Sequence, residues 1–301
     1  MATDKNKTVI IIAGPTAVGK TAAAIEVAKH FHTAIISADS RQCYKEMNIG
    51  VARPTSDELK AVPHYFIATH SIHDDVNASL FEKYALQKVN DLFKDHDVVV
   101  MVGGTGLYIK AFCEGLDEIP AVPEEIRKNI IAGYQHNGLA WLQSQVQQKD
   151  PAYYKTGEIQ NPQRLMRALE VFEATGKSIT TFQKKEKTAR DFRIIKIGLQ
   201  IPKEELHQRI NGRVDKMIAD GLVDEVKNLY PFKSLVALQT VGYKEIIDFI
   251  DKKISLEEAI ELVKINTRRY AKRQLTWFRK DKDYQWFDPG ELEPPSIVNS
   301  Q

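Results

Sequence analysis

Short apolar runs alternate along the chain with longer segments of helical composition. The first run, residues 8–13, is rich in β-branched side chains and shows no polar alternation. Such a run is typical of a strand that is buried on both faces of a parallel sheet. Similar runs at residues 34–37, 98–102 and 193–201 predict three further strands. Strands separated by helical segments predict an α/β fold, with a parallel sheet flanked by helices and right-handed crossovers.

The interval between the third and fourth predicted strands, about 90 residues long, shows no convincing strand. We interpret residues 117–192 as an all-helical insertion domain, which leaves residues 1–116 and 193–301 for the sheet and its helices. A long final helix is predicted over residues 256–278. Its buried stripe is expected to contain Leu262, Ile265, Leu275 and Phe278.

A glycine-bearing turn follows the first predicted strand and precedes a helix. Its sequence, GPTAVGKT, matches the phosphate-loop pattern G-x-x-x-x-G-K-[ST] in the strand–helix context that gives the pattern meaning. Backbone N–H groups of such a loop surround phosphate oxygens, Lys20 adds a positive charge, and Thr21 offers a hydroxyl to Mg²⁺. A turn that serves packing alone is the weaker alternative. The motif therefore predicts a diphosphate or polyphosphate ligand, without specifying ATP, at Gly14, Pro15, Thr16, Ala17, Val18, Gly19, Lys20 and Thr21.

Two other predicted strands end in polar or glycine-rich residues. Asp39 follows the second strand, and Gly103, Gly104 and Thr105 follow the third. Ligands of parallel sheets bind at the carboxyl ends of the strands, so Asp39, Thr105 and Lys20 are expected to converge. Asp39 is either a general base or metal-linked carboxylate, or the N-cap of a helix. The two glycines either admit a bulky group close to the backbone or form a simple turn.

Composition narrows the class of protein. The chain has 301 residues, of which 43% are hydrophobic and 27% charged, as in soluble globular proteins. No apolar run approaches the roughly 20 residues of a membrane helix. The two cysteines, Cys43 and Cys113, form no CxxC, which argues against a disulfide framework or a cysteine-rich zinc site and favours the cytoplasm. The eight histidines are scattered and predict no metal site.

Charge is concentrated in the predicted final helix and the residues after it. Residues 264–282 contain eight basic residues and one acid, on a chain whose formal net charge is only +2. This surplus favours a polyanionic partner, although a solvated outer face is the usual role of such residues. Arg269 and Arg273 are the residues of this helix that we expect to contact phosphates.

Further motifs follow the phosphate loop in order, and with them the chain resembles the isopentenyl-tRNA transferase family, the bacterial tRNA dimethylallyltransferases. The motifs are DSRQCY at 39–44, MNIG at 47–50, ARP at 52–54, VGGTGLY at 102–108, NPQRLMRALE at 161–170, VGY at 241–243 and TRRYAKRQLTWFR at 267–279. Each is weak alone, but the set covers nearly the whole chain.

The resemblance implies a reaction and its partners. A dimethylallyl group would pass from dimethylallyl diphosphate to N6 of the adenine 3′-adjacent to the anticodon, in tRNAs reading UNN codons. The phosphate loop would hold the donor diphosphate with Mg²⁺, and the helical insertion would grip the anticodon stem-loop. The family resemblance also implies a monomer with no obligate protein partner. The adenine would be flipped out of its stack, with Tyr44 or Tyr108 as aromatic neighbours or as packing residues.

The resemblance also implies roles for single residues. Asp39 corresponds to the general base, Thr105 lies beside the reacting centre, and Arg213 neutralises the departing diphosphate. Thr21, and with it Asp39, would be linked to Mg²⁺. The segments implied to touch tRNA contain Asp39, Ser40, Arg41, Gln42, Thr105, Arg127, Gln163, Arg164, Leu165, Met166, Arg167, Gln239, Thr240, Val241, Gly242, Tyr243 and Lys244.

Two other classes of protein remain as alternatives. A small-molecule or nucleotide kinase would use the same phosphate loop, but it gives no reason for the helical insertion or the basic helix. A non-catalytic RNA-binding protein would leave the phosphate loop unexplained.

Overall fold

The computed structural model describes residues 7–183 and 186–299 and contains two compact units. The first unit comprises Met1–Glu114 and Ala189–Gln301, and the second comprises Gly115–Thr188. The second unit therefore ends before residue 192, where the sequence placed the end of the insertion. The cause is Arg190, which donates hydrogen bonds to the carbonyl oxygens of Ala111 and Phe112 and pairs with Glu82 at 2.7 Å, all in the first unit.

The first unit is built on a parallel sheet with the strand order β3-β2-β4-β1-β5-β6. The prediction of an α/β fold is confirmed, and the four predicted strands are present with ends shifted by at most two residues. Two strands were missed, because β3 has two residues and β6 is short and mixed in polarity. The strands are β1 (Thr8–Ala13), β2 (Ile35–Ser37), β3 (His64–Tyr65), β4 (Val98–Gly103), β5 (Arg193–Leu199) and β6 (Tyr284–Phe287).

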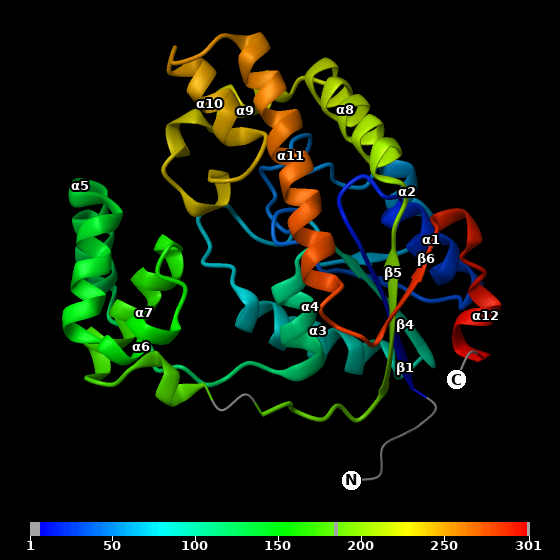
Figure 1. Cartoon of the computed structure of the whole chain (residues 1–301). Helices are drawn as coiled ribbons and strands as arrows, with labels where there is room; N and C mark the ends of the chain where they lie inside the picture. The colour runs from blue at the N-terminus through cyan, green and yellow to red at the C-terminus, as the bar shows by residue number, and fades with distance from the viewer. Residues whose placement is uncertain (1–6, 184–185, 300–301) are drawn as a thin grey trace. The chain divides into compact units, whose positions relative to one another are not determined.

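Helices cover both faces of this sheet. Val9 and Ile11 of β1 pack with α3 (Ala78–Leu92) and α4 (Gly106–Glu114), while Ile10 and Ile12 point to the opposite face. There they pack with α1 (Lys20–His30), and α12 (Pro294–Asn299) covers the same side, as Figure 1 shows. Successive side chains of a strand point to opposite faces, so a strand covered on both must be apolar throughout. This explains the uninterrupted apolar runs.

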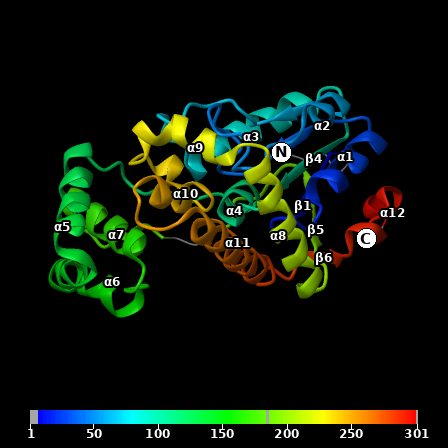
Figure 2. The ribbon, with the colours of Figure 1, turned by 90° about the horizontal axis from the view of Figure 1, so that it is seen from above.

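Helix α11 (Leu256–Phe278) has the bounds that the sequence predicts. Ser255 and Glu258 form a reciprocal capping box at its first turn. The expected stripe is wrong at Leu262, which is 37% exposed, and right at Phe278, which is buried. The helix packs beside α8 (Lys203–Ala219), as Figure 2 shows, and its buried positions are Ala259, Val263, Ala271, Gln274 and Phe278.

Shorter helices complete the first unit between these elements. They are α2 (Ser56–Ala61), α9 (Leu222–Leu229), α10 (Tyr243–Ile250) and the 3₁₀ turns Tyr230–Phe232, Val236–Leu238 and Pro289–Glu291. Over residues 7–183 and 186–299, no helix is both long and apolar enough to cross a membrane.

The second unit is helical in all its described elements. It contains α5 (Glu124–Lys149), α6 (Pro151–Thr156), α7 (Pro162–Thr175) and a 3₁₀ turn at Ile179–Phe182. Gly138 interrupts α5 with φ 74° and ψ −169°. The unit has its own core, formed by apolar side chains such as Leu142, Val146, Leu165 and Leu169. It can therefore be described as a separate folding unit.

The sheet is tightly packed at the end of β4, and a substitution there can test this. A Cβ on Gly103 would lie 2.2 Å from the carbonyl oxygen of Ala38, whereas a Cβ on Gly212 of α8 would meet no atom within 4 Å. We expect Gly103→Ala to lower the free energy of unfolding by about 2–3 kcal/mol through overpacking. Gly212→Ala, as the matched control, should raise it by about 0.5–1 kcal/mol, because alanine is the better helix former. Chemical denaturation measures both, and equal stability of the two variants would contradict the packing argument.

Candidate active site

The phosphate loop joins β1 to α1 in a backbone path that only small residues allow. A Cβ on Gly14 would lie 2.7 Å from the carbonyl oxygen of Leu199, and Gly19 has φ +107°. Ala17 also adopts a left-handed conformation, with φ 65°. Lys20 begins α1 and its Nζ donates a hydrogen bond to the carbonyl oxygen of Pro15 at 2.7 Å. The loop thus folds around its own lysine, at the positive end of a helix.

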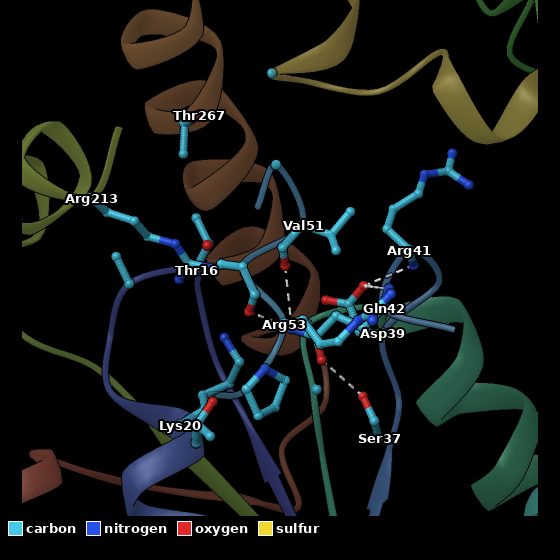
Figure 3. A pocket seen from close by; sticks show the side chains of 18 of the residues that line it. Thr16, Lys20, Ser37, Asp39, Arg41, Gln42, Val51, Arg53, Arg213 and Thr267 are labelled. Atoms are coloured by element: carbon cyan, nitrogen blue, oxygen red, sulfur yellow. Dashed lines mark hydrogen bonds between the residues drawn. The ribbon is translucent and has the colours of Figure 1, made fainter. Parts of the chain in front are cut away.

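A cavity of about 610 Å³ lies at the carboxyl ends of β1, β2 and β4. Lys20, Asp39 and Arg213 come to it from three different segments, as Figure 3 shows. The sequence therefore correctly brings Lys20 and Asp39 to one place. Of the predicted site residues, those that line the cavity are Thr16, Ala17, Gly19, Lys20, Thr21, Asp39, Ser40, Arg41, Gln42, Arg213, Thr240, Val241 and Gly242.

Asp39 caps a turn after β2, and no helix begins there, so the N-cap of a helix is not its role. Its Oδ1 accepts the backbone N–H groups of Arg41 at 2.8 Å and Gln42 at 3.2 Å, so this oxygen caps the turn after β2. No hydrogen bond reaches Oδ2 from the described residues. One carboxylate oxygen is therefore fixed by the backbone, and the other remains able to accept a proton in the cavity.

Thr105 forms hydrogen bonds to Ser40 in the same turn. Its Oγ1 accepts the backbone N–H of Ser40 at 3.0 Å and donates to the Ser40 hydroxyl at 3.3 Å. Thr105 is not among the described residues that line the cavity. In this structure it positions the Asp39 turn.

Positive charge in the cavity is only partly compensated. Burial and the neighbouring Arg213 lower the pKa of Lys20 to about 7, against the opposing effect of Asp39. Burial also lowers the pKa of Arg213, and Asp39 again opposes the shift. Arg213 has no ion pair or hydrogen bond among the described residues. A cavity with an unpaired guanidinium and a buried ammonium favours an anionic ligand.

Gln274 of α11 is a site residue that the sequence did not single out. Its Oε1 accepts the backbone N–H of Thr16 at 2.8 Å, and its Nε2 donates to the carbonyl oxygen of Gly104 at 2.9 Å. The side chain thus links the phosphate loop to the end of β4. The available signal was a lone amide among the apolar positions of a buried helix stripe.

Gly103, the last residue of β4, and Gly104 after it serve the protein's own packing. A Cβ on Gly104 would lie 2.2 Å from Nε2 of Gln274, just as a Cβ on Gly103 would strike Ala38. The group that approaches the backbone closely is therefore Gln274 and the neighbouring strand end. Close packing thus accounts for both glycines, and both also line the cavity.

Glu225 of α9 organises one wall of the cavity. Its carboxylate accepts the backbone N–H groups of Asn48, Ile49 and Gly50 at 2.8–3.1 Å, and the hydroxyl of Tyr243 at 2.5 Å. Tyr243 is fully buried, and Gly242 is also buried. Of the expected tRNA-contacting segment 239–244, the exposed residues are Gln239 and Lys244, and the side chain of Tyr243 anchors the wall.

Arg53 lines the cavity and supports the same wall, as Figure 3 shows. It donates to the carbonyl oxygens of Tyr44 at 2.7 Å, Lys45 at 3.0 Å and Met47. Tyr44 itself is only 3% exposed, so it packs in the core and is not a platform for an adenine ring. Tyr108 is buried as well and stacks on Phe81. Of the described phenylalanine, tyrosine and tryptophan side chains, that of Tyr270 lines the cavity.

The second unit holds the other residues expected to touch tRNA. Gln163 and Arg164 are exposed at the start of α7, whereas Leu165 and Met166 are buried in the core of the unit. Their side chains cannot touch a ligand in this structure. The periodicity of α7 decides this, because residues 165 and 166 fall on its inward face.

The basic residues near α11 are partly used within the fold. Lys264 pairs with Asp215 at 2.8 Å and with Glu261 at 3.1 Å, and Arg268 donates to Asn211. Arg269 donates to Asn266 of its own helix, and Arg273 lies 5.7 Å from the ring centre of Tyr270. Arg269 and Arg273 therefore keep their charge available, as the expected phosphate contact requires.

The oxygen donors near the phosphate loop suit Mg²⁺ only in part. Thr21 and Asp39 line the same cavity, and a hydroxyl and a carboxylate are ligands that Mg²⁺ accepts. Among the described residues there is no group of three or more His, Cys, Asp and Glu side chains that could hold a metal. The residues present therefore fit Mg²⁺ when diphosphate oxygens complete its coordination.

Comparison with known sequences identifies the family of this chain. The family model described as IPP transferase matches residues 42–281. The tRNA dimethylallyltransferase of Christiangramia forsetii is 53% identical over 279 residues, which are 93% of this chain and 92% of that protein. The tRNA dimethylallyltransferase 1 of Bacteroides thetaiotaomicron is 44% identical over 282 residues, covering 94% and 92% of the two chains.

Solved structures show the same relationship. The full-length tRNA isopentenylpyrophosphate transferase of Bacillus halodurans matches with a TM-score of 0.70 and 35% identity, over 98% of this chain and 94% of that one. A eukaryotic dimethylallyltransferase solved acting on tRNA matches with a TM-score of 0.76 and 25% identity, over 98% and 77%. With the family match spanning most of the sequence, the chain belongs to the IPP transferase family.

Proposed function

We propose that this protein transfers a dimethylallyl group from dimethylallyl diphosphate to N6 of the adenine 3′-adjacent to the anticodon of tRNA. The observation that carries the proposal is one cavity shared by a phosphate loop, Arg213 and Asp39. Neither the Arg213 guanidinium nor Oδ2 of Asp39 has a hydrogen-bond partner among the described residues. The phosphate loop and Arg213 suit a diphosphate leaving group, and Asp39 suits a nucleophile that must lose a proton. A kinase is not favoured, because the relatives are tRNA-modifying transferases.

The reaction is a displacement at the allylic carbon of the donor. The adenine N6 forms a bond to this carbon as the carbon–oxygen bond breaks, and the bonding electron pair leaves with the diphosphate. The N6 proton passes to Oδ2 of Asp39. Lys20, Arg213 and the N–H groups of the phosphate loop stabilise the charge that develops on the leaving oxygen. Mg²⁺, held by Thr21 and the diphosphate, would add Lewis-acid stabilisation to the same group.

The adenine has to leave its stack to reach this cavity. N6 of a stacked base is inaccessible to a carboxylate that lies on a turn after a buried strand. Tyr270 lines the cavity and is 36% exposed, so its ring can receive a flipped base. Gln42 is held by Ser37 and by the carbonyl oxygens of Val51 and Ala52, which gives the opposite wall a fixed shape.

Binding of the RNA outside the cavity would use exposed polar side chains. We propose Gln163, Arg164, Arg127 and Arg167 on the helical unit, with Arg269 and Arg273 on α11. Arginine recognises phosphate by charge and by paired N–H donors, and these contacts fix the register of a nucleic acid.

Mass spectrometry of an anticodon stem-loop tests the proposal directly. The stem-loop, with adenine after a UNN-reading anticodon, is incubated with protein, Mg²⁺ and dimethylallyl diphosphate, and with ATP in a parallel sample. One added dimethylallyl group at that adenine is the expected product. Phosphate transfer or ATP hydrolysis without prenylation would contradict the proposal and support the kinase alternative.

Asp39→Asn separates proton acceptance from the structural role of the side chain. The amide oxygen can still accept the N–H groups of Arg41 and Gln42, so the turn should persist. An amide cannot take the N6 proton, so we expect turnover to fall about 10²–10⁴-fold while tRNA affinity is retained. Single-turnover rates and RNA binding measure the two effects.

Asp74→Asn is the matched control for this change. Its carboxylate accepts the backbone N–H of Ser71 in an exposed turn, so it has the same capping role away from the cavity. This variant should keep the wild-type rate. Near-normal turnover of Asp39→Asn would remove Asp39 from the role of base.

Donor binding should be linked to proton uptake through Lys20. The pKa of Lys20 is lowered to about 7 in the free protein, so most of its amine is neutral near pH 8. A bound diphosphate favours the ammonium and raises that pKa towards its ordinary value. Uptake should therefore approach one proton near pH 8 and vanish below about pH 6, where Lys20 is protonated in both states.

Calorimetry in buffers of different ionisation enthalpy measures this uptake with an alkyl diphosphate as ligand. Lys29→Met, at the far end of α1, is the control and should leave it unchanged. Binding near pH 8 without proton uptake would show that Lys20 is already charged in the free protein.

A further inference from the structure

Two arginines on neighbouring helices of the second unit share one buried carboxylate. Arg127 lies on α5, while Arg167 and Glu170 lie one turn apart on α7. Arg167 Nη1 donates to Glu170 Oε2 at 3.3 Å, and Arg127 Nε lies 4.0 Å from Glu170 Oε1. Each arginine therefore faces a different oxygen of the same carboxylate.

Burial differs sharply within this group. The side chain of Glu170 is 7% exposed, whereas those of Arg127 and Arg167 are 51% and 41% exposed. The carboxylate thus lies beneath two guanidinium groups that remain open to solvent. Each guanidinium has five N–H donors, and that of Arg127 makes no hydrogen bond to any described residue, so most donors stay available.

The charge of the group is not balanced. A buried carboxylate needs one cationic partner, and the second arginine leaves a surplus of one positive charge. Three other described cations of the unit each have a separate acid as partner. Lys128, Lys149 and Arg164 pair with an acid of their own, respectively Glu124, Glu173 and Glu158.

We propose that Glu170 is a positioning residue that holds Arg127 and Arg167 as a two-armed clamp for one phosphate group of the RNA backbone. Without the carboxylate, the two guanidinium groups would repel each other and separate. With it, they present parallel N–H donors to a phosphate, which supplies the missing negative charge. This inference rests on the proposed function, because it takes tRNA as the source of the phosphate.

Glu170→Gln tests the clamp, because the two explanations predict opposite changes in the affinity for RNA. If charge alone mattered, removing an acid would tighten RNA binding. If Glu170 positions the arginines, binding should weaken about fivefold to tenfold although the protein becomes more positive. The KM for tRNA should rise with little change in kcat, and the salt dependence of binding should become shallower by about one phosphate contact.

Glu173→Gln is the matched control on the same helix. Glu173 pairs with one described cation, Lys149, so its loss should leave affinity unchanged or slightly higher. Unchanged or tighter binding by Glu170→Gln, with the wild-type salt dependence, would overturn the inference. Binding of the anticodon stem-loop is measured separately from prenyl transfer. An inactive wild-type protein would therefore refute the proposed function, while the binding comparison still decides the clamp.

A second set of variants avoids changing the buried acid. Arg127→Gln and Arg167→Gln alter half-exposed side chains and should leave the unit folded, as thermal unfolding can verify. A clamp needs both arms, so each single change should weaken stem-loop binding about tenfold and the double change by much less than a hundredfold. Effects that multiply would mean that the two arginines act independently and would refute the clamp.

Discussion

The close approach of the loops after β1, β2 and β4 is the constraint on which the rest of the site depends. Gly103 allows the carbonyl oxygen of Ala38 to lie where a side chain would otherwise stand. Gln274 then spans from Thr16 to Gly104 and joins the outer helix to both loops. A buried amide without hydrogen bonds destabilises the fold, so the two hydrogen bonds of Gln274 hold the phosphate loop at a fixed distance from β4. Asp39 directly follows Ala38, so its position depends on the close contact between Ala38 and Gly103.

The two units share one electrostatic feature, which is a group of cationic side chains with too few acidic partners. In the cavity, burial and the neighbouring Arg213 lower the pKa of Lys20 to about 7, and Asp39 only partly opposes this shift. In the helical unit, Arg127 and Arg167 share Glu170. Both arrangements leave positive charge without a full set of protein anions. A phosphorylated ligand, as proposed for both sites, would restore the balance by pairing with charges that the fold itself does not neutralise.

The sequence predicts what local patterns determine. The apolar runs, the phosphate loop and the bounds of α11 follow from strand composition, a contiguous motif and a capping box at Ser255. The roles of Gln274 and Glu225 depend instead on partners about 258 and 177 residues away. No periodicity reports such a contact. Leu262 shows a related limit, since either of two adjacent helix faces could carry the apolar stripe until the neighbours are known.

Motifs that identify a family do not by themselves identify contacts with a substrate. The segments MNIG and VGY lie far apart in the sequence, yet both form hydrogen bonds to Glu225. Its carboxylate accepts three backbone N–H groups of the first segment and the hydroxyl of Tyr243 from the second. Tyr243 is inaccessible, while its neighbours Thr240 and Val241 line the cavity. A short motif can therefore combine one anchoring side chain with others that face the ligand. A motif match does not tell these two roles apart. The burial and hydrogen bonds of each residue do.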